Sequence, residues 1–147
     1  MSGLRLAVQG HSLFDGLPAR ATLARWIGLA LEGDGEITLR FVGAAEARRL
    51  NRDYRGKDYA TNVLTFGYTR APAVHADIVL CVPVIRREAR EQRRSFRDRL
   101  AHLVVHGVLH ARGYDHERAA QARQMERIEV AILARLGLPD PYRAPVD

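Results

Sequence analysis

Apolar and polar residues alternate in short stretches of the chain. Residues 4–8 and 37–41 follow a period of two, which predicts half-buried strands. Residues 63–66 form a third short stretch of strand character. Residues 77–81 are apolar on both faces, as is typical of a strand inside a sheet. The pattern therefore predicts about four strands, with residues 77–81 in a central one.

Between and after these stretches the apolar residues recur three and four positions apart, which predicts helices. We expect five of them, at about residues 18–33, 44–52, from 83 onward, 95–112 and 117–136. Pro18 is suited to the start of the first helix and Gly33 to its end. Ser95 and Asp98 resemble a capping box at the start of the fourth helix. All elements are expected to form one domain, residues 1–147.

Residues 51–61 fit neither period and contain almost nothing to bury. We expect a polar loop here, and Arg55 and Lys57 belong to it. Functional groups are often carried on such loops, although a solvated connection would have the same composition. The pattern alone leaves both interpretations open.

The chain of 147 residues has a net charge of +6, and Lys57 is its only lysine. Because the guanidinium group binds phosphate through two parallel hydrogen bonds, an arginine-rich chain suits an acidic polymer, and RNA is the first candidate. A bias in genome composition would also produce the preference for arginine. Arg86 and Arg90 lie near one face of the third predicted helix and are candidates for RNA binding, although interspersed carboxylates favour a solvated face.

Cys81 is the only cysteine and lies in an apolar run, so no disulfide framework is expected. No stretch approaches the roughly 20 apolar residues of a membrane span. The first ten residues lack the pattern of a secretory signal. We therefore expect a cytoplasmic protein without a membrane partner.

The strongest chemical signal is the stretch from His106 to His116. His106 and His110 are four residues apart and share one face of a helix, so both can bind one metal ion. Gly113 can adopt the left-handed conformation that ends a helix and returns the chain. His116 is then available as a third nitrogen ligand. Three histidines with one open coordination position are typical of a catalytic zinc site.

Zinc peptidases with this histidine spacing have a glutamate, the general base, directly after the first histidine. Gly107 occupies that position here. We interpret the glycine as an open, uncharged space beside the metal in which a phosphodiester could bind. On this hypothesis Gly107→Ala would be no less stable than wild type.

The segment His106–His116 resembles the signature of the YbeY family, the bacterial endoribonucleases of ribosomal RNA maturation. A second family block appears at Asn51, Tyr54, Arg55, Lys57, Asp58, Thr61, Val63, Leu64 and Phe66. The resemblance extends from the first strand to about Gly137. Ala60, Asn62 and Ala76 depart from it, since the family commonly has proline, aspartate and glycine there.

The resemblance implies a zincin-like α+β metal-dependent hydrolase fold, with a mixed sheet of about four strands packed against about five helices. It also implies one zinc ion per chain held by His106, His110 and His116, and a catalytic role for Arg55. The expected activity is zinc-dependent cleavage of single-stranded RNA, in maturation of the 3′ end of small-subunit ribosomal RNA and in ribosome quality control. The small ribosomal subunit and its assembly factors would be partners.

In this mechanism the metal polarises a phosphoryl oxygen and acidifies water, while Arg55 holds a nonbridging oxygen. Asp77, Asp115 and Glu117 are candidates for the general base, and Asp115 could instead orient a ligand histidine. Two other classes of protein remain possible. One is a noncatalytic ribosome-assembly factor with a structural zinc, and the other is a zinc peptidase, which Gly107 disfavours.

Overall fold

The structure, a computed structural model, describes residues 3–145. Its four strands are β1 (Leu4–Gln9), β2 (Gly35–Val42), β3 (Val63–Thr69) and β4 (Val74–Cys81). Its α-helices are α1 (Arg20–Leu31), α2 (Ala44–Arg55), α3 (Val82–Glu91), α4 (Phe96–Ala111) and α5 (Ala119–Arg135). The predicted α+β class is confirmed, with four strands and five α-helices in the part of the chain that the structure describes. A short 3₁₀ helix, His11–Leu13, lies between β1 and α1.

The strands form one mixed sheet in the order β1-β2-β4-β3. β1, β2 and β4 are parallel, and β3 runs antiparallel to β4 at the edge. β4 is interior, as its apolar run predicts. Its alternate residues Ala76, Ile78 and Leu80 are fully buried on the side of α1 and α4.

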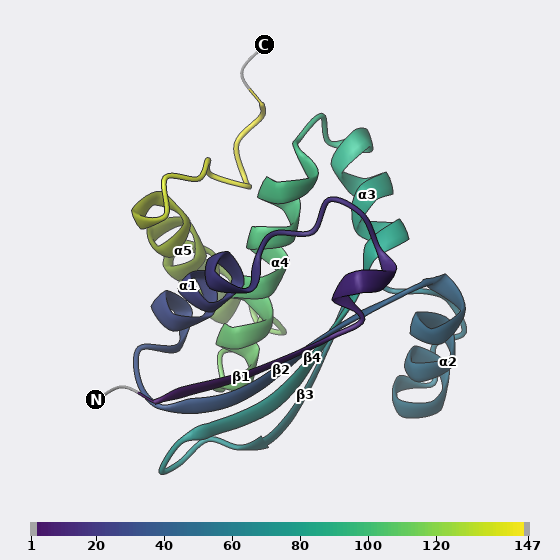
Figure 1. Cartoon of the computed structure of the whole chain (residues 1–147). Helices are drawn as coiled ribbons and strands as arrows, with labels where there is room; N and C mark the ends of the chain where they lie inside the picture. Colours follow the sequence, from purple (N-terminus) through teal and green to yellow (C-terminus); the bar gives the residue numbers. More distant parts are fainter. Residues whose placement is uncertain (1–2, 146–147) are drawn as a thin grey trace.

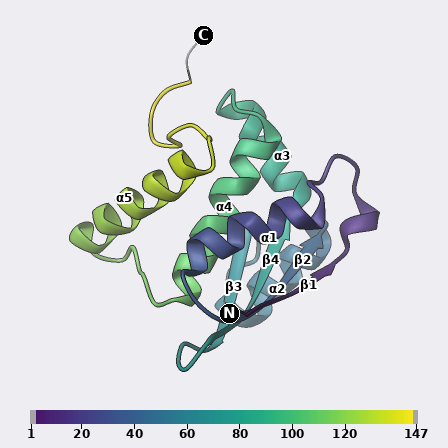
Figure 2. The ribbon, with the colours of Figure 1, turned by 60° about the vertical axis from the view of Figure 1, so that its left-hand side comes forward.

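The helices are unequally divided between the two faces of the sheet. α1, α4 and α5 lie together on one side, and α2 lies on the other (Figures 1 and 2). The main core joins α1, α4 and α5 to the first face. A smaller cluster joins Ala47 of α2 to Leu64, Val79 and Cys81 on the second face. α4 packs against β3 and β4 on one side and against α1 and α5 on others, with most of its residues buried.

Several predicted element ends are wrong, among them the start of the first helix, since α1 begins at Arg20 and not at Pro18. α1 ends at Leu31 with Glu32 in the left-handed conformation (φ 51°), one residue before Gly33. α2 continues to Arg55, so half of the predicted polar loop is helical. Asn51, which we expected in that loop, is fully buried, and its side-chain amide donates to the carbonyl of Tyr59 (3.0 Å). A buried polar residue of this kind adds nothing to an apolar period, so the pattern of apolar positions did not extend the helix to it.

Candidate metal centre

α4 carries the first two histidines of the site. Its N-terminus is capped by Ser95, whose hydroxyl accepts from the backbone N–H of Asp98 (3.0 Å), which is one of the two bonds of the predicted capping box. Leu100, Val104 and Val108 bury one side of the helix. His106 and His110 therefore lie on the neighbouring face, both half-buried.

The turn after α4 brings back the third histidine. Gly113 has φ +105°, and its N–H donates to the carbonyl of His110 (2.9 Å). The N–H of Tyr114 donates to the carbonyl of Leu109 (3.1 Å), which completes a Schellman motif. The predicted left-handed glycine is confirmed. The chain then reverses and places the exposed His116 beside α4.

The three imidazoles form one compact group. His110 Nε2 and His116 Nδ1 are 3.0 Å apart, and the ring centroids of His106 and His110 are 4.9 Å apart. One nitrogen from each of the three rings lies within 4.8 Å of the others. The spacing that predicted a common site is confirmed by this geometry.

Glu129 of α5 orients the first histidine. Its Oε2 lies 2.6 Å from His106 Nδ1, and its side chain is only 1% exposed. A carboxylate only accepts, so Nδ1 of His106 carries the donated proton, and in the neutral ring the lone pair is then on Nε2. Carboxylate–histidine pairs fix metal-binding imidazoles in the same way.

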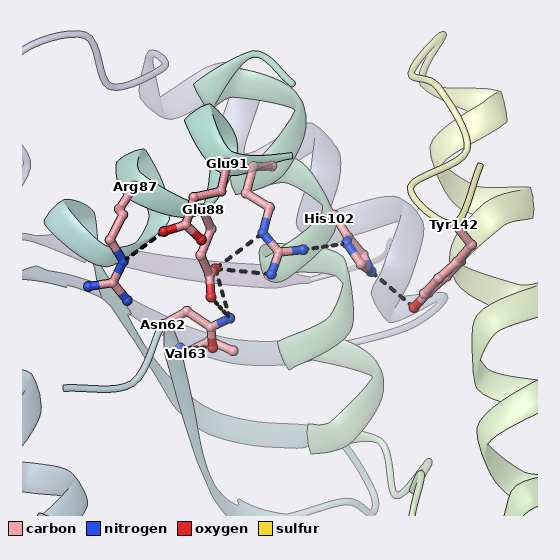
Figure 3. A network of polar contacts seen from close by, with 8 residues as sticks. Asn62, Val63, Arg87, Glu88, Glu91, His102 and Tyr142 are labelled. Atoms are coloured by element: carbon pink, nitrogen blue, oxygen red, sulfur yellow. Dashed lines mark hydrogen bonds and ion pairs between the residues drawn. The ribbon is translucent and has the colours of Figure 1, made fainter. Parts of the chain in front are cut away.

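The other oxygen of Glu129 is held by a second set of donors. Oε1 lies 2.9 Å from His102 Nε2 and also accepts from the Tyr142 hydroxyl. Arg99 donates to His102 Nδ1 (3.2 Å), and because guanidinium cannot accept, the His102 proton lies on Nε2 and points at Glu129. Figure 3 shows the outer part of this network, from Asn62 through Glu88 to His102 and Tyr142.

The network determines the charge of Glu129. Burial raises the pKa of this carboxyl, but the hydrogen bonds from His102, His106 and Tyr142 outweigh burial and lower its pKa to about 2. Burial and the neighbouring His106 and His116 lower the pKa of His110 to about 4. At neutral pH the site thus combines an ionised orienting carboxylate with a neutral His110.

These properties fit a metal ion. Imidazoles bind metal in their neutral form, and His106 Nε2 is left free by the bond to Glu129. His106, His110 and His116 would hold the ion. His102, His106 and Glu129 form a second close group, but the atoms that face one another there, His102 Nε2, His106 Nδ1 and the two oxygens of Glu129, are already paired. We assign that group to orientation of the first.

A cavity of about 510 Å³ opens beside His110. It is lined by Thr65, Gly67, Tyr68, Thr69, Arg70, His110 and Ala111. The guanidinium of Arg70 lies against the backbone of Gly113, with Nη1 2.8 Å from where a Cβ would stand. An exposed arginine thus lines the same cavity as a metal-ligand candidate. Sequence analysis did not single out Arg70, because β3 and α4 meet only in the fold.

The predicted RNA-binding residues lie elsewhere. Arg55 is the last residue of α2 and is exposed, as is the following Lys57. Neither lines the cavity beside His110. Arg86 donates to the carbonyl of Asp15 (2.5 Å) and lies over the ring of Phe96, whereas Arg90 is exposed on α3.

The interpretation of Gly107 as an open space is wrong. The glycine is buried, and a Cβ added to it would lie 3.0 Å from Ile78 Cγ2 and 3.3 Å from Thr65 Oγ1. It faces the sheet, where the absence of a side chain lets α4 approach β3 and β4. A glutamate here would meet the sheet, and Ile78 and Thr65 would have to move to make room for it.

Two of the three carboxylates suggested as general base, Asp77 and Asp115, accept hydrogen bonds from other groups. Asp77 lies on the opposite face of β4 from Ile78 and accepts from the Tyr68 hydroxyl (2.6 Å). Asp115 accepts from the backbone N–H of His116 (2.7 Å) and contacts no imidazole by a hydrogen bond. Glu129 was missed, although it follows Met125 by four positions and precedes Ile132 by three. A carboxylate on an apolar helix face is a signal for a buried partner.

Asn62, where the family commonly has aspartate, is part of the outer network. Its amide donates to both oxygens of Glu88 (3.1 and 3.3 Å), and Arg99 donates to the same carboxylate. The Asn62 side chain therefore donates to Glu88 and accepts from the backbone N–H of Val63. Position 62 therefore serves the contact between β3 and α3.

The fold and the site together define a small α+β protein with a group of three histidines, two on α4 and one after the turn that follows it. Residues 20–137 match the family described as Endoribonuclease YbeY, and the chain belongs to this family.

Relatives named Endoribonuclease YbeY include a protein of Acidovorax sp., 58% identical over 150 residues, which cover 98% of this chain and 99% of that one. Another, of Polaromonas naphthalenivorans, is 52% identical over 149 residues, with 97% and 99% covered. The solution structure of TM1509 from Thermotoga maritima has the same fold, with a TM-score of 0.57, 24% identity, and coverage of 94% and 99%.

Proposed function

We propose that this protein is a metal-dependent endoribonuclease that cleaves single-stranded RNA, with one zinc ion per chain held by His106, His110 and His116. The observation that carries the proposal is the compact group of imidazoles, oriented by the buried Glu129 and opening on a cavity lined by Arg70. Membership of a family whose relatives are named endoribonuclease supports the choice of RNA.

When bound, zinc supplies Lewis acidity toward a phosphoryl oxygen and acidifies water. The chain itself supplies orientation and charge. Glu129 keeps the His106 proton on Nδ1 and the ring at a fixed angle. Arg70, in the cavity beside His110, would donate to a nonbridging phosphate oxygen.

We also propose that Arg55 contributes to catalysis by binding RNA phosphate, with Lys57, Arg86 and Arg90 as further contacts along the strand. The exposure of Arg55 supports this role. Arg55→Lys keeps the charge but loses the planar fork, so we expect it to lower RNA cleavage about tenfold or more, with metal content unchanged. Arg135→Lys, an exposed arginine at the end of α5, is the matched control. Equal cleavage rates for Arg55→Lys and wild type would contradict the role.

Ribosomal RNA, especially the 3′ end of the small-subunit precursor, is the proposed substrate, and the small ribosomal subunit and its assembly factors are the proposed partners. The net charge of +6 supports binding to an acidic polymer. A cytoplasmic location follows from this choice of substrate. No helix in the described part of the chain is long and apolar enough to cross a membrane.

The test is metal analysis together with cleavage of an end-labelled single-stranded fragment of ribosomal RNA by the purified protein. We expect about one zinc per chain, and cleavage that stops on chelation and returns on adding zinc. Circular dichroism of the chelated protein separates catalysis from a structural role. If chelation unfolds the chain and the folded, loaded protein does not cut RNA, the metal is structural and the protein is a noncatalytic assembly factor.

A further inference from the structure

A second cavity lies on the face of the sheet opposite the histidines. Its volume is about 580 Å³, and it lies between α2 and the second face of the sheet. Its lining residues are Gln9, Thr38, Arg40, Glu46, Leu50, Tyr54, Phe66, Tyr68, Asp77 and Val79. Glu46, Leu50 and Tyr54 lie one turn apart on one face of α2, so this helix forms one wall of the cavity and the sheet forms the other.

Aromatic rings concentrate at this cavity. Tyr54 and Tyr68 are 69% and 56% exposed, which places them among the most exposed large hydrophobic residues of the described chain. Tyr54 meets Phe66 edge to face, with centroids 5.2 Å apart. Exposed rings of this kind have not buried their faces in the core, and a flat ligand can stack on them.

The polar groups of the cavity indicate a neutral ligand. Arg40 is paired with Glu46 (2.7 Å) and donates to Gln9 (3.1 Å), so its charge is offset. Asp77 accepts from the Tyr68 hydroxyl and adds a negative charge. A phosphate would be repelled by these two carboxylates, whereas a heterocycle with its own N–H groups and acceptors could bond to Asp77 and Arg40.

The two cavities adjoin across the edge strand. Thr65 and Gly67 of β3 line the cavity beside His110, Phe66 lines the second, and Tyr68 lines both. β3 is an outer strand of the sheet, with no strand beyond it among the described residues. A single strand of RNA whose phosphate lies at the histidines can therefore pass over β3 and reach the second cavity.

We propose that this second cavity binds an unpaired nucleobase of the RNA substrate, stacked on Tyr54 and Tyr68. The inference rests on the proposed endoribonuclease function and adds a base-binding subsite to it. Double-stranded RNA would not supply such a base, so the subsite selects single-stranded RNA.

The test measures binding of a fluorescent single-stranded oligoribonucleotide of about ten nucleotides by anisotropy. Tyr54→Leu and Tyr68→Leu are each expected to weaken binding about tenfold, because a stacked base is lost. Tyr54→Phe and Tyr68→Phe keep the rings and should bind within about threefold of wild type. Tyr59→Leu is the matched control, since Tyr59 is 54% exposed but does not line the cavity. Thermal melts establish that each variant is folded.

A second experiment identifies which nucleotide of the RNA supplies the bound base. Oligoribonucleotides with a single abasic position are compared, and one position should weaken binding to wild type but not to Tyr54→Leu. The inference is overturned if Tyr54→Leu and Tyr68→Leu bind like wild type, or if Tyr59→Leu loses as much affinity. It is also overturned if the phenylalanine variants lose as much as the leucine variants.

The two proposals can fail separately. RNA that is bound in a Tyr54-dependent way but never cut would contradict the endoribonuclease proposal. RNA that is cut by wild type and bound and cut equally by the leucine variants would contradict only the nucleobase subsite.

Discussion

The face of the sheet that carries α1 and α4 is covered along its length, whereas the opposite face is covered by α2 at one end only. On the first face Ile37, Leu39 and Ile78 are fully buried. On the second, Arg5 and Glu36 are exposed. The covered face holds the histidines on a rigid helix, and the open face presents aromatic and polar side chains to solvent. A rigid support suits a metal, which needs fixed ligand geometry, and an open surface suits a flexible strand.

The largest expected effect is the loss of metal from the site on the covered face. His106→Ala, His110→Ala or His116→Ala should each abolish stoichiometric metal binding, since two imidazoles remain. Elemental analysis of the purified variants measures this. His75→Ala, an exposed histidine on the open face, should retain full metal content. A fully loaded variant would remove that histidine from the site.

Glu129→Gln should be next in magnitude. The glutamine keeps the shape but replaces an ionised acceptor that holds His102, His106 and Tyr142, and its N–H₂ would meet donors. We expect a loss of about 3 kcal/mol in the free energy of unfolding and about 10- to 100-fold weaker metal binding. Chemical denaturation and metal titration measure the two effects. Glu126→Gln, one turn earlier and exposed, is the control, and an equal loss there would refute the orienting role.

The pH dependence of stability tests whether Glu129 is ionised in the folded chain. The pKa of Glu129 is about 2 in the folded chain, against 4.5 for an ordinary glutamate, so the folded state binds this proton less readily. Its contribution to stability is therefore complete above about pH 4.5 and is lost as the pH falls toward 2. The stability difference between metal-free wild type and Glu129→Gln should shrink over this range. A difference that does not change with pH would contradict an ionised Glu129.

The smallest effect compares two glycines in helices. Gly107→Ala places a Cβ 3.0 Å from Ile78 Cγ2, whereas Gly28 of α1 is exposed, with nothing within 4 Å of an added Cβ. Alanine favours a helix by about 1 kcal/mol over glycine, and overpacking costs about 1–3 kcal/mol. We expect Gly107→Ala to lose about 1 kcal/mol and Gly28→Ala to gain about the same. Thermal melts that shift both variants upward would show that Ile78 and Thr65 yield easily.

Periodicity predicted the strands and helices well where one face of an element is apolar. It failed at α2, whose last turn contains Asn51 and Arg55 and has no apolar stripe. That turn is helical because Asn51 is buried and bonded to Tyr59, and because Gly56 caps the helix in the left-handed conformation. Tertiary burial of a polar side chain is invisible to a hydrophobic pattern.

The meaning of Gly107 also depended on the fold. From the sequence, a glycine in place of the peptidase glutamate indicated open space beside the metal. The structure shows that this helix face meets Ile78 and Thr65 of the sheet. Which side of a helix faces a sheet and which faces a ligand is decided by packing between distant segments.

The sequence by itself determined the three histidines, because two lie one turn apart on a helix and the third follows a glycine turn six residues later. These relations are local, because helix geometry brings the first two side chains together and the glycine turn returns the third. Tertiary structure alone decided their surroundings. Glu129 reaches His106 from 23 residues away, and Arg70 reaches the cavity beside His110 from the end of β3. Such contacts depend on how α5 and β3 pack against α4, and no local spacing encodes that packing.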